Sequence, residues 1–166
     1  MAVASACDTT APVVREPVPF RVLLQSGGFF EEYASTPDGG GEPVPPASVA
    51  LSSEAEEEAF LDGYPRNPYW IDGGGPFYEP FPDVDYAAET AVVVALGTAG
   101  SGSVLVRVDS VVSDGRRARV FSTTVLPCLG TRDVANPAAI VALQGERWDV
   151  RFEGRQVERQ DCTVGR

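Results

Sequence analysis

The stretch TAVVVALGTAGSGSVLVRVDSVV, residues 90–112, decides the fold class of this chain. It begins with a near-continuous apolar run, which is typical of a central β-strand covered on both faces. After a glycine-rich connection the pattern alternates, with valine at positions 104, 106 and 108 and the charged residues Arg107 and Asp109 between them. This period of two predicts a strand with one buried face, so the centre of the chain is expected to hold two β-strands joined by a loop.

The connection between these strands, LGTAGSGS at residues 96–103, raises the question of a phosphate-binding loop. A Walker loop needs a lysine, a dinucleotide fingerprint needs the order G-x-G-x-x-G, and both open a helix whose amides face the phosphate. Here the order is G-x-x-G-x-G, the chain has no lysine, and a strand pattern follows. We therefore expect a flexible strand-to-strand loop with glycines at positive φ, and no cofactor.

The rest of the chain adds several strand patterns. They fall at residues 20–24, 29–33, 49–51, 116–127, 140–143 and 148–160. The sequence Ser26-Gly27-Gly28 predicts a hairpin turn between the first two strands, and a Ser-Asp-Gly turn at residues 113–115 predicts a second hairpin. Short strands with frequent turns favour a sandwich or a barrel. We predict an all-β fold, an antiparallel β-sandwich for which an Ig-like arrangement is one alternative, with one short α-helix in the N-terminal half.

The helix is predicted from the pattern SSEAEEEAFLDG, which follows the strand at residues 49–51. Ser53 can accept a hydrogen bond from the amide of Glu56 while the Glu56 side chain reaches back, which is a capping box. We expect Ala55, Ala59 and Phe60 to form the buried face and the glutamates to be solvated.

Composition divides the chain into a tether and one domain. Residues 1–19 are small, polar and proline-containing and predict a flexible N-terminal tether, whereas residues 20–166 predict a single β-rich domain. Residues 36–48 combine a glycine triplet with four prolines and predict an exposed loop.

A second irregular segment, residues 64–82, gathers aromatic residues and prolines without periodicity. Its candidate ligand-binding rings are Tyr69, Trp70, Phe77, Tyr78 and Phe81. Exposed rings could stack on a glycan or a peptide, but rings in an irregular loop can also anchor it to a sheet, and we favour the second interpretation.

The charge pattern excludes several classes of function. The chain carries 24 acidic residues against thirteen arginines and no histidine, for a net charge of −11, which argues against nucleic acid as a partner. Histidine, the commonest general base and transition-metal ligand, is missing. Asp83, Asp85 and Glu89 could in principle act as acids or hold calcium, but no nucleophile and base accompany them. We therefore expect no enzyme activity and no metal site.

Several segments resemble one bacterial family. These are DVDYAAETAVVVALGTAGSGSVLVRVDSVV, VFSTTVLPC, NPAAIVAL and DVRFEGR, all within residues 83–162. They resemble the C-terminal domain of the PrcB family. The resemblance implies a noncatalytic, extracytoplasmic envelope protein, often a lipoprotein, that supports a protease. The chain departs from the family where an aromatic residue usually follows the glycine-rich loop, because Val104 stands there, which puts a family-like partner contact in doubt.

The loop itself is the predicted contact with a protein partner. Its candidate residues are Gly97, Thr98, Gly100, Ser101, Gly102 and Ser103. The prediction is a binding or scaffolding module that modulates a protease. The alternative is a cell-wall or glycan-binding envelope protein that uses residues 64–82.

Three cysteines bear on location. Cys128 ends one predicted strand and Cys162 follows the last, so a disulfide between them is expected, with two independent buried thiols as the alternative. Cys7 follows the small residues VASA, as in a lipobox, and we expect its lipidation to be the chain's membrane attachment. Only six residues precede it, fewer than a signal peptide needs.

Overall fold

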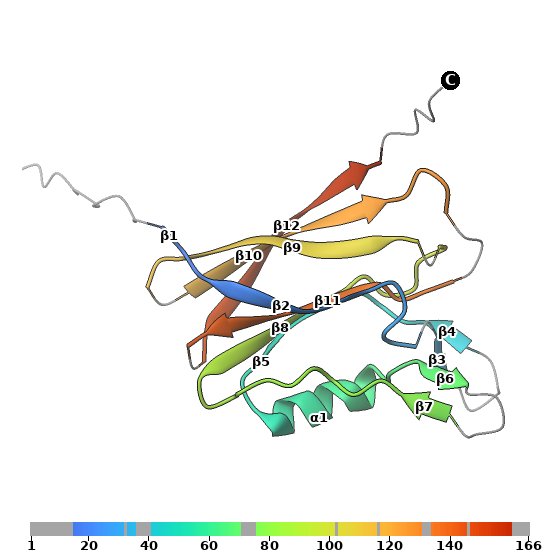
Figure 1. Ribbon diagram of the computed structural model, residues 1–166, viewed down its shortest axis with the longest axis horizontal. Helices are drawn as coiled ribbons and strands as arrows, with labels where there is room; N and C mark the ends of the chain where they lie inside the picture. The colour runs from blue at the N-terminus through green and yellow to red at the C-terminus, as the bar shows by residue number, and fades with distance from the viewer. Residues whose placement is uncertain are drawn as a thin grey trace, which may run out of the picture.

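Two four-stranded β-sheets pack face to face in the computed structural model of the chain (Figure 1). The structure describes residues 15–31, 33–35, 41–70, 76–101, 103–115, 117–130, 134–145 and 147–160. The first sheet has the order β1 (Glu16–Pro17), β9 (Leu105–Ser113), β10 (Arg117–Leu126), β12 (Asp149–Arg159). The second has the order β2 (Phe20–Ser26), β11 (Ala138–Gln144), β8 (Glu89–Ala95), β5 (Ala47–Leu51). Together with one helix, α1 (Glu54–Gly63), this confirms the predicted sandwich.

Two short ribbons complete the described elements. They are β3 (Tyr33–Ser35) with β4 (Gly41–Pro43), and β6 (Pro68–Trp70) with β7 (Pro76–Tyr78). Both lie within or beside segments for which the sequence predicts irregular structure. Within residues 36–48, the prediction of a loop is therefore wrong for β4 and for the start of β5. Both of these strands are short.

The central strands of the second sheet, β8 and β11, are buried on both faces, which explains the apolar run of β8. Val92 and Val94 point into the core between the sheets, where they meet Val106 and Val120 of the first sheet. The side chain of Val93 points to the opposite face, into a second core. All three valines are at most 1% exposed, so the prediction of a strand covered on both faces is confirmed.

The second core is closed by a third layer, which consists of α1 and the coil that precedes β8 (Figure 1). Phe29 and Phe30 are fully buried there and pack edge to face at 4.9 Å. The rings of Phe60 and Tyr64 stack at 4.8 Å beside them. Because aromatic rings bury large apolar areas, this cluster fixes the helix to the sheet.

The cap of α1 follows the sequence prediction, whereas its core-facing side does so only in part. The Ser53 hydroxyl accepts a hydrogen bond from the Glu56 amide at 3.2 Å. The Glu56 carboxylate in turn accepts a hydrogen bond from the amide of Ser52. Ala55 and Ala59 are exposed, contrary to expectation. Phe60 does pack against the core, as predicted, and it is joined there by Leu61 and by Tyr64, which follows the helix.

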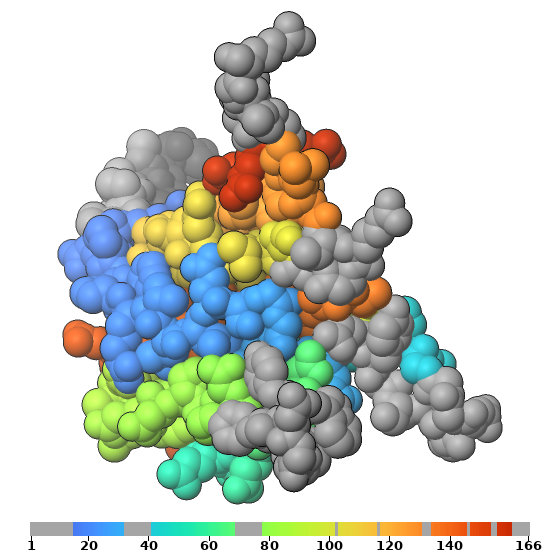
Figure 2. Space-filling model, turned by 45° about the vertical axis from the view of Figure 1, so that its right-hand side comes forward, coloured from blue at the N-terminus to red at the C-terminus, as the bar shows by residue number. Residues whose placement is uncertain are grey.

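The predicted N-terminal hairpin is wrong. β2 pairs with β11, and Phe30 bridges to Arg66, so residues 29–33 do not return beside β2. Instead, the chain turns towards the third layer, where Phe29 and Phe30 are buried. β2 consequently lies at the edge of its sheet, where Figure 2 shows it crossing the surface between β9 and the coil before β8.

The second predicted hairpin, β9 with β10, is confirmed, and β12 adds to it in parallel. This is the one parallel pairing among the described strands, so the antiparallel prediction fails there. The reason is topological. The chain leaves β10, runs back through β11 in the other sheet, and returns in the original direction as β12.

The folded unit starts before residue 20. Glu16 and Pro17 pair with Ser113 and Val112 of β9, and Val18 is only 8% exposed within the core. The prediction of a tether over residues 1–19 is therefore wrong for residues 16–18, which belong to the folded domain.

Candidate functional site

The glycine-rich connection runs from strand to strand, as predicted, and β9 begins at Leu105 without a helix. Gly97 adopts φ +72°, the conformation that glycine allows at low cost. The amide of Thr98 donates to the Val44 carbonyl at 2.9 Å, and the Val44 amide donates to the Thr98 hydroxyl at 2.8 Å. The start of the loop is thus fixed against the segment before β5.

This contact requires glycine at position 97 for a second reason. A Cβ placed there would collide with the carbonyl oxygen of Val44 and lie 2.7 Å from both the carbonyl carbon of Pro45 and the nitrogen of Pro46. Two backbones therefore approach so closely that no side chain fits between them. The two parts of this contact are a glycine that follows a strand and a proline pair that is distant in the sequence. No sequence pattern links them, so the sequence alone could not predict this role of Gly97.

The middle of the loop is held by a second backbone contact. The amide of Ala99 donates to the Ala135 carbonyl at 2.7 Å, and the Ala135 amide donates back to Ala99 at 3.1 Å. Ser101 then turns the chain, since its carbonyl accepts from the Val104 amide. Gly100 is exposed, and a Cβ there would have no neighbour within 4 Å.

The predicted contact residues therefore have different surroundings. Gly97 is buried, Gly100 is exposed, and Thr98, Ser101 and Ser103 are half-buried. Gly102 lies outside the described residues. Among its described residues, the loop offers a partner only a narrow tip above a base that is hydrogen-bonded to Val44 and Ala135.

Two segments contact this loop, since Gly130 lies against Ser101 and Ala135 pairs with Ala99, and both segments carry exposed apolar side chains. We call this region the loop end and define it as residues 97–104, 127–130 and 134–136 with the C-terminal ends of β10 and β12. Leu129 is 83% exposed and Val134 is 37% exposed. Val157 of β12, which pairs with Thr124, is 61% exposed. Figure 2 shows the end of β12 and the segment after β10 projecting together from the molecule.

The cysteines can be placed only in part. Cys128, in the loop end, is disulfide-bonded. Its expected partner, Cys162, and the expected lipidation site, Cys7, lie outside the described residues, so the pairing and the lipid anchor stay predictions.

The structure separates the candidate aromatic residues. The backbones of Tyr69 and Phe77 pair in the β6–β7 ribbon, which also contains Trp70, but these three side chains lie outside what the structure describes. Tyr78 is 44% exposed. Phe81 packs against the buried Phe29 at 6.4 Å, which favours the anchoring interpretation for this ring.

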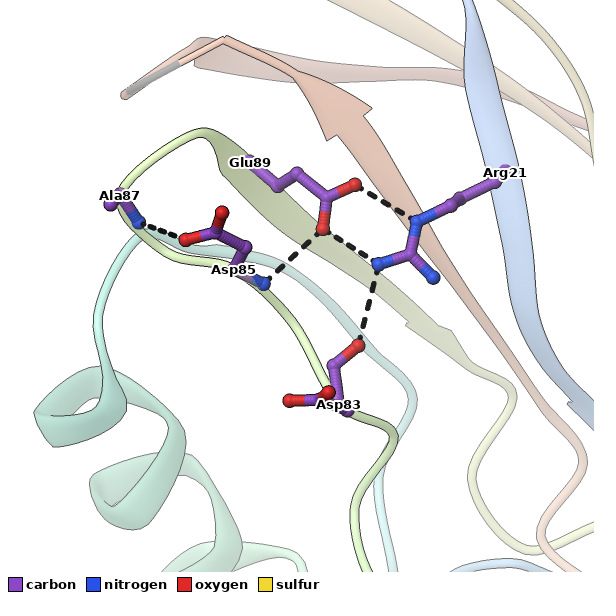
Figure 3. A network of polar contacts seen from close by, with 5 residues as sticks. All are labelled: Arg21, Asp83, Asp85, Ala87 and Glu89. Atoms are coloured by element: carbon purple, nitrogen blue, oxygen red, sulfur yellow. Dashed lines mark hydrogen bonds and ion pairs between the residues drawn. The ribbon is translucent and has the colours of Figure 1, made fainter.

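The acidic residues before β8 form a structural network (Figure 3). Arg21 of β2 reaches both oxygens of Glu89, at 2.9 and 2.7 Å, and contacts the Asp83 carbonyl. The Asp85 amide donates to Glu89, and the Asp85 carboxylate accepts from the Ala87 amide. Its hydrogen bond to Arg21 lowers the pKa of Glu89, so this group stays ionised at neutral pH and is a poor proton donor.

A second carboxylate of the third layer is also engaged. The Tyr86 hydroxyl donates to the Glu57 carboxylate at 2.7 Å. Burial, and then this hydrogen bond, raise the pKa of the Tyr86 phenol. The helix glutamates were expected to be solvated, and Glu57 departs from that expectation because it anchors the coil to α1.

Two hollows are lined by residues that the sequence does not predict as candidate site residues. One, of about 470 Å³, lies between β1, the β9–β10 turn and Trp148, whose indole nitrogen donates to the Gln144 carbonyl at 2.8 Å. The other, of about 240 Å³, lies on the outer face of the first sheet around Arg107 and Asp109. Sequence reasoning missed both, because each depends on strand register and turn placement.

The described ranges hold no helix long and apolar enough to cross a membrane. Within the same ranges, no group of three or more acidic, cysteine or histidine side chains is placed to hold a metal ion. No protein-family model matches the chain, and comparisons with curated proteins and with solved structures find no match either. The resemblance to the PrcB family stays a prediction from the residues that carry it.

Proposed function

We propose that the chain is a noncatalytic binding module and that its loop end contacts a protein partner. The observation that carries this proposal is the exposure of Leu129 and Val134 on the two segments that contact the glycine-rich loop, with Val157 also exposed on β12, which pairs with the end of β10. Exposed apolar side chains that gather in one region mark protein contacts more often than scattered ones.

The hydrogen bonds that hold the glycine-rich loop suit such a role. The loop is held by two hydrogen bonds between Thr98 and Val44, one of them to the Thr98 hydroxyl, and by two backbone hydrogen bonds between Ala99 and Ala135. A contact surface that is rigid before binding loses little conformational entropy on association. Loops held by a stable scaffold are also where binding residues concentrate.

The place of action that we propose is the bacterial cell envelope, outside the cytoplasm. The disulfide at Cys128 supports an oxidising compartment, because structural disulfides are rare in the cytosol. The small residues before Cys7 support a lipid anchor, and the family resemblance supports a protease as the partner. The observed placement of Phe81 in the second core weakens the alternative in which the aromatic segment binds glycans.

Site-specific photo-crosslinking in the native host tests the contact surface. A photoreactive residue replaces Leu129 in one variant and Val22 of β2 in the other, because both side chains are large, apolar and exposed, at 83% and 59%. We expect one discrete protein adduct from position 129, none from position 22, and loss of the adduct when Val157→Glu is added. Equal labelling at both positions, or no adduct at position 129, contradicts the proposal.

Intact mass, measured with and without reductant on protein from its native locus, tests the location. A diacyl or triacyl mass on Cys7 together with a disulfide supports the envelope. A chain without lipid and with three free thiols contradicts it.

A further inference from the structure

Two β-bulges meet at one level of the first sheet. Between β9 and β10, the pairing changes from Phe121 with Ser110 to Ser122 with Val108, which leaves Asp109 without a counterpart. Between β10 and β12, the register shifts at the same point of β10, between Phe121 and Ser122. A bulge locally redirects side chains and is frequent beside binding sites. Here two of them flank the same residues of the central strand.

The bulges open a pocket of about 240 Å³ on the outer face of this sheet. Its wall includes Arg107, Asp109, Ser110, Phe121, Thr123 and Gln156. Asp109 and Ser110 are adjacent in sequence yet both exposed, because the bulge interrupts the alternation that would bury one of them.

The charged groups at the pocket are paired with one another. The Arg107 guanidinium donates to Asp109 at 2.8 Å and to Glu158 at 2.8 Å, and the Thr123 hydroxyl donates to Asp109 at 2.6 Å. The arginine is thus surrounded by two carboxylates, which disfavours an anionic ligand. Both carboxylates are already engaged by the arginine, which disfavours a metal ion. Each carboxylate still has free acceptor positions, so a neutral ligand with hydroxyl groups fits the charge of the site.

The remaining groups supply what such a ligand needs. In the described part of the chain, the side chains of Ser110 and Gln156 make no hydrogen bond, and each can both donate and accept. Phe121 is half-buried and contributes a ring to the wall. An apolar ring face beside a few convergent polar groups is the general form of a small-molecule site.

We propose that this pocket binds a saccharide, one sugar ring at a time, through hydroxyl contacts to Asp109, Ser110 and Gln156 and apolar contact with Phe121. The volume is slightly below the range of about 300–1,000 Å³ that is usual for drug-sized ligands, which suits a single ring. The pocket is on the sheet and not in the loops of the loop end, so the inference is independent of the proposed protein contact.

A nuclear magnetic resonance titration of the full-length, isotope-labelled chain tests the proposal. The probes are glucose, galactose, mannose and N-acetylglucosamine, with inorganic phosphate as the anionic comparison. We expect at least one sugar to shift the amide signals of Ser110, Phe121 and Gln156 saturably and independently of salt, because a neutral ligand is not screened. Ser110→Ala combined with Gln156→Ala should weaken that binding about tenfold or more, since each lost hydrogen bond contributes modestly.

Two further variants make the result specific. Gln25→Ala removes an exposed amide from β2 in the other sheet and should leave sugar binding unchanged. Phe121→Leu keeps the apolar volume but removes the ring, and should weaken binding while the urea midpoint stays close to wild type. The proposal is overturned if no sugar shifts these amides, if the double variant binds as wild type does, or if phosphate alone binds.

Discussion

Replacing Gly97 with alanine tests the close contact between the loop and the segment before β5. The residue has φ +72°, and an alanine in the left-handed region costs about 1–2 kcal/mol. Its Cβ would lie 2.7 Å from atoms of Pro45 and Pro46, so the two backbones must separate. Separation weakens the two hydrogen bonds between Thr98 and Val44, each worth about 0.5–1.5 kcal/mol. We expect Gly97→Ala to lower the free energy of unfolding by about 2–5 kcal/mol.

Gly100→Ala, in the same loop, is the matched control. It has no positive φ, and no atom lies within 4 Å of its would-be Cβ, so we expect a change within about 0.5 kcal/mol. Urea unfolding followed by intrinsic fluorescence measures both variants. With a slope of about 2 kcal/mol per molar urea, the Gly97→Ala midpoint should fall by about 1–2.5 M at an unchanged slope. If the two variants unfold at the same urea concentration, the close approach does not constrain the loop and the reasoning is wrong.

Three other substitutions probe the third layer and its border with the sheet. Ser53→Ala removes the helix cap and should destabilise the chain by about 1 kcal/mol in the same urea assay, with loss of helical circular dichroism if α1 frays. Tyr86→Phe removes the hydrogen bond to Glu57 and should cost about 1–2 kcal/mol, while an ultraviolet titration of wild type should show one phenol that ionises above the range of exposed tyrosines. Glu89→Gln removes the ion pair with Arg21. Because that pair lowers the pKa of Glu89, its stabilisation is full above the ordinary glutamate pKa and is lost as pH falls through the lowered value, so the urea midpoints of variant and wild type should converge in acid.

The sequence predicted the elements whose signals are local. The apolar run of β8, the alternation of β9 and the turn at residues 113–115 each depend on neighbours within a few positions, and all three are present. The Ser53 cap was predicted for the same reason, because it involves only the first turn of the helix.

The failures involve partners that are distant in sequence. Residues 29–33 have a strand pattern, but their two phenylalanines serve a core that also needs Ile140, more than a hundred positions away. Ala55 and Ala59 were wrongly predicted to be buried because alanine is compatible with either side of a helix, and Tyr64 contacts the core from beyond the end of the helix. No local signal indicated which of these contacts would form.

The candidate site shows the same limit. The glycine-rich loop was recognised as a connection between strands, but its attachment to Val44 and Ala135 depends on tertiary packing. The pocket around Asp109 depends on a register shift, and a strand pattern of alternating residues does not reveal where one extra residue is inserted.

The pairing of β2 with β11 has a consequence for when the protein can fold. Phe20–Ser26 emerge from the ribosome early, but the strand that completes their hydrogen bonds is Ala138–Gln144, near the end of the chain. Until then the N-terminal third of the chain has no partner for β2, and topologies dominated by such distant pairings fold slowly, in milliseconds to seconds. β2 therefore completes its hydrogen bonds only after nearly the whole described chain has been made.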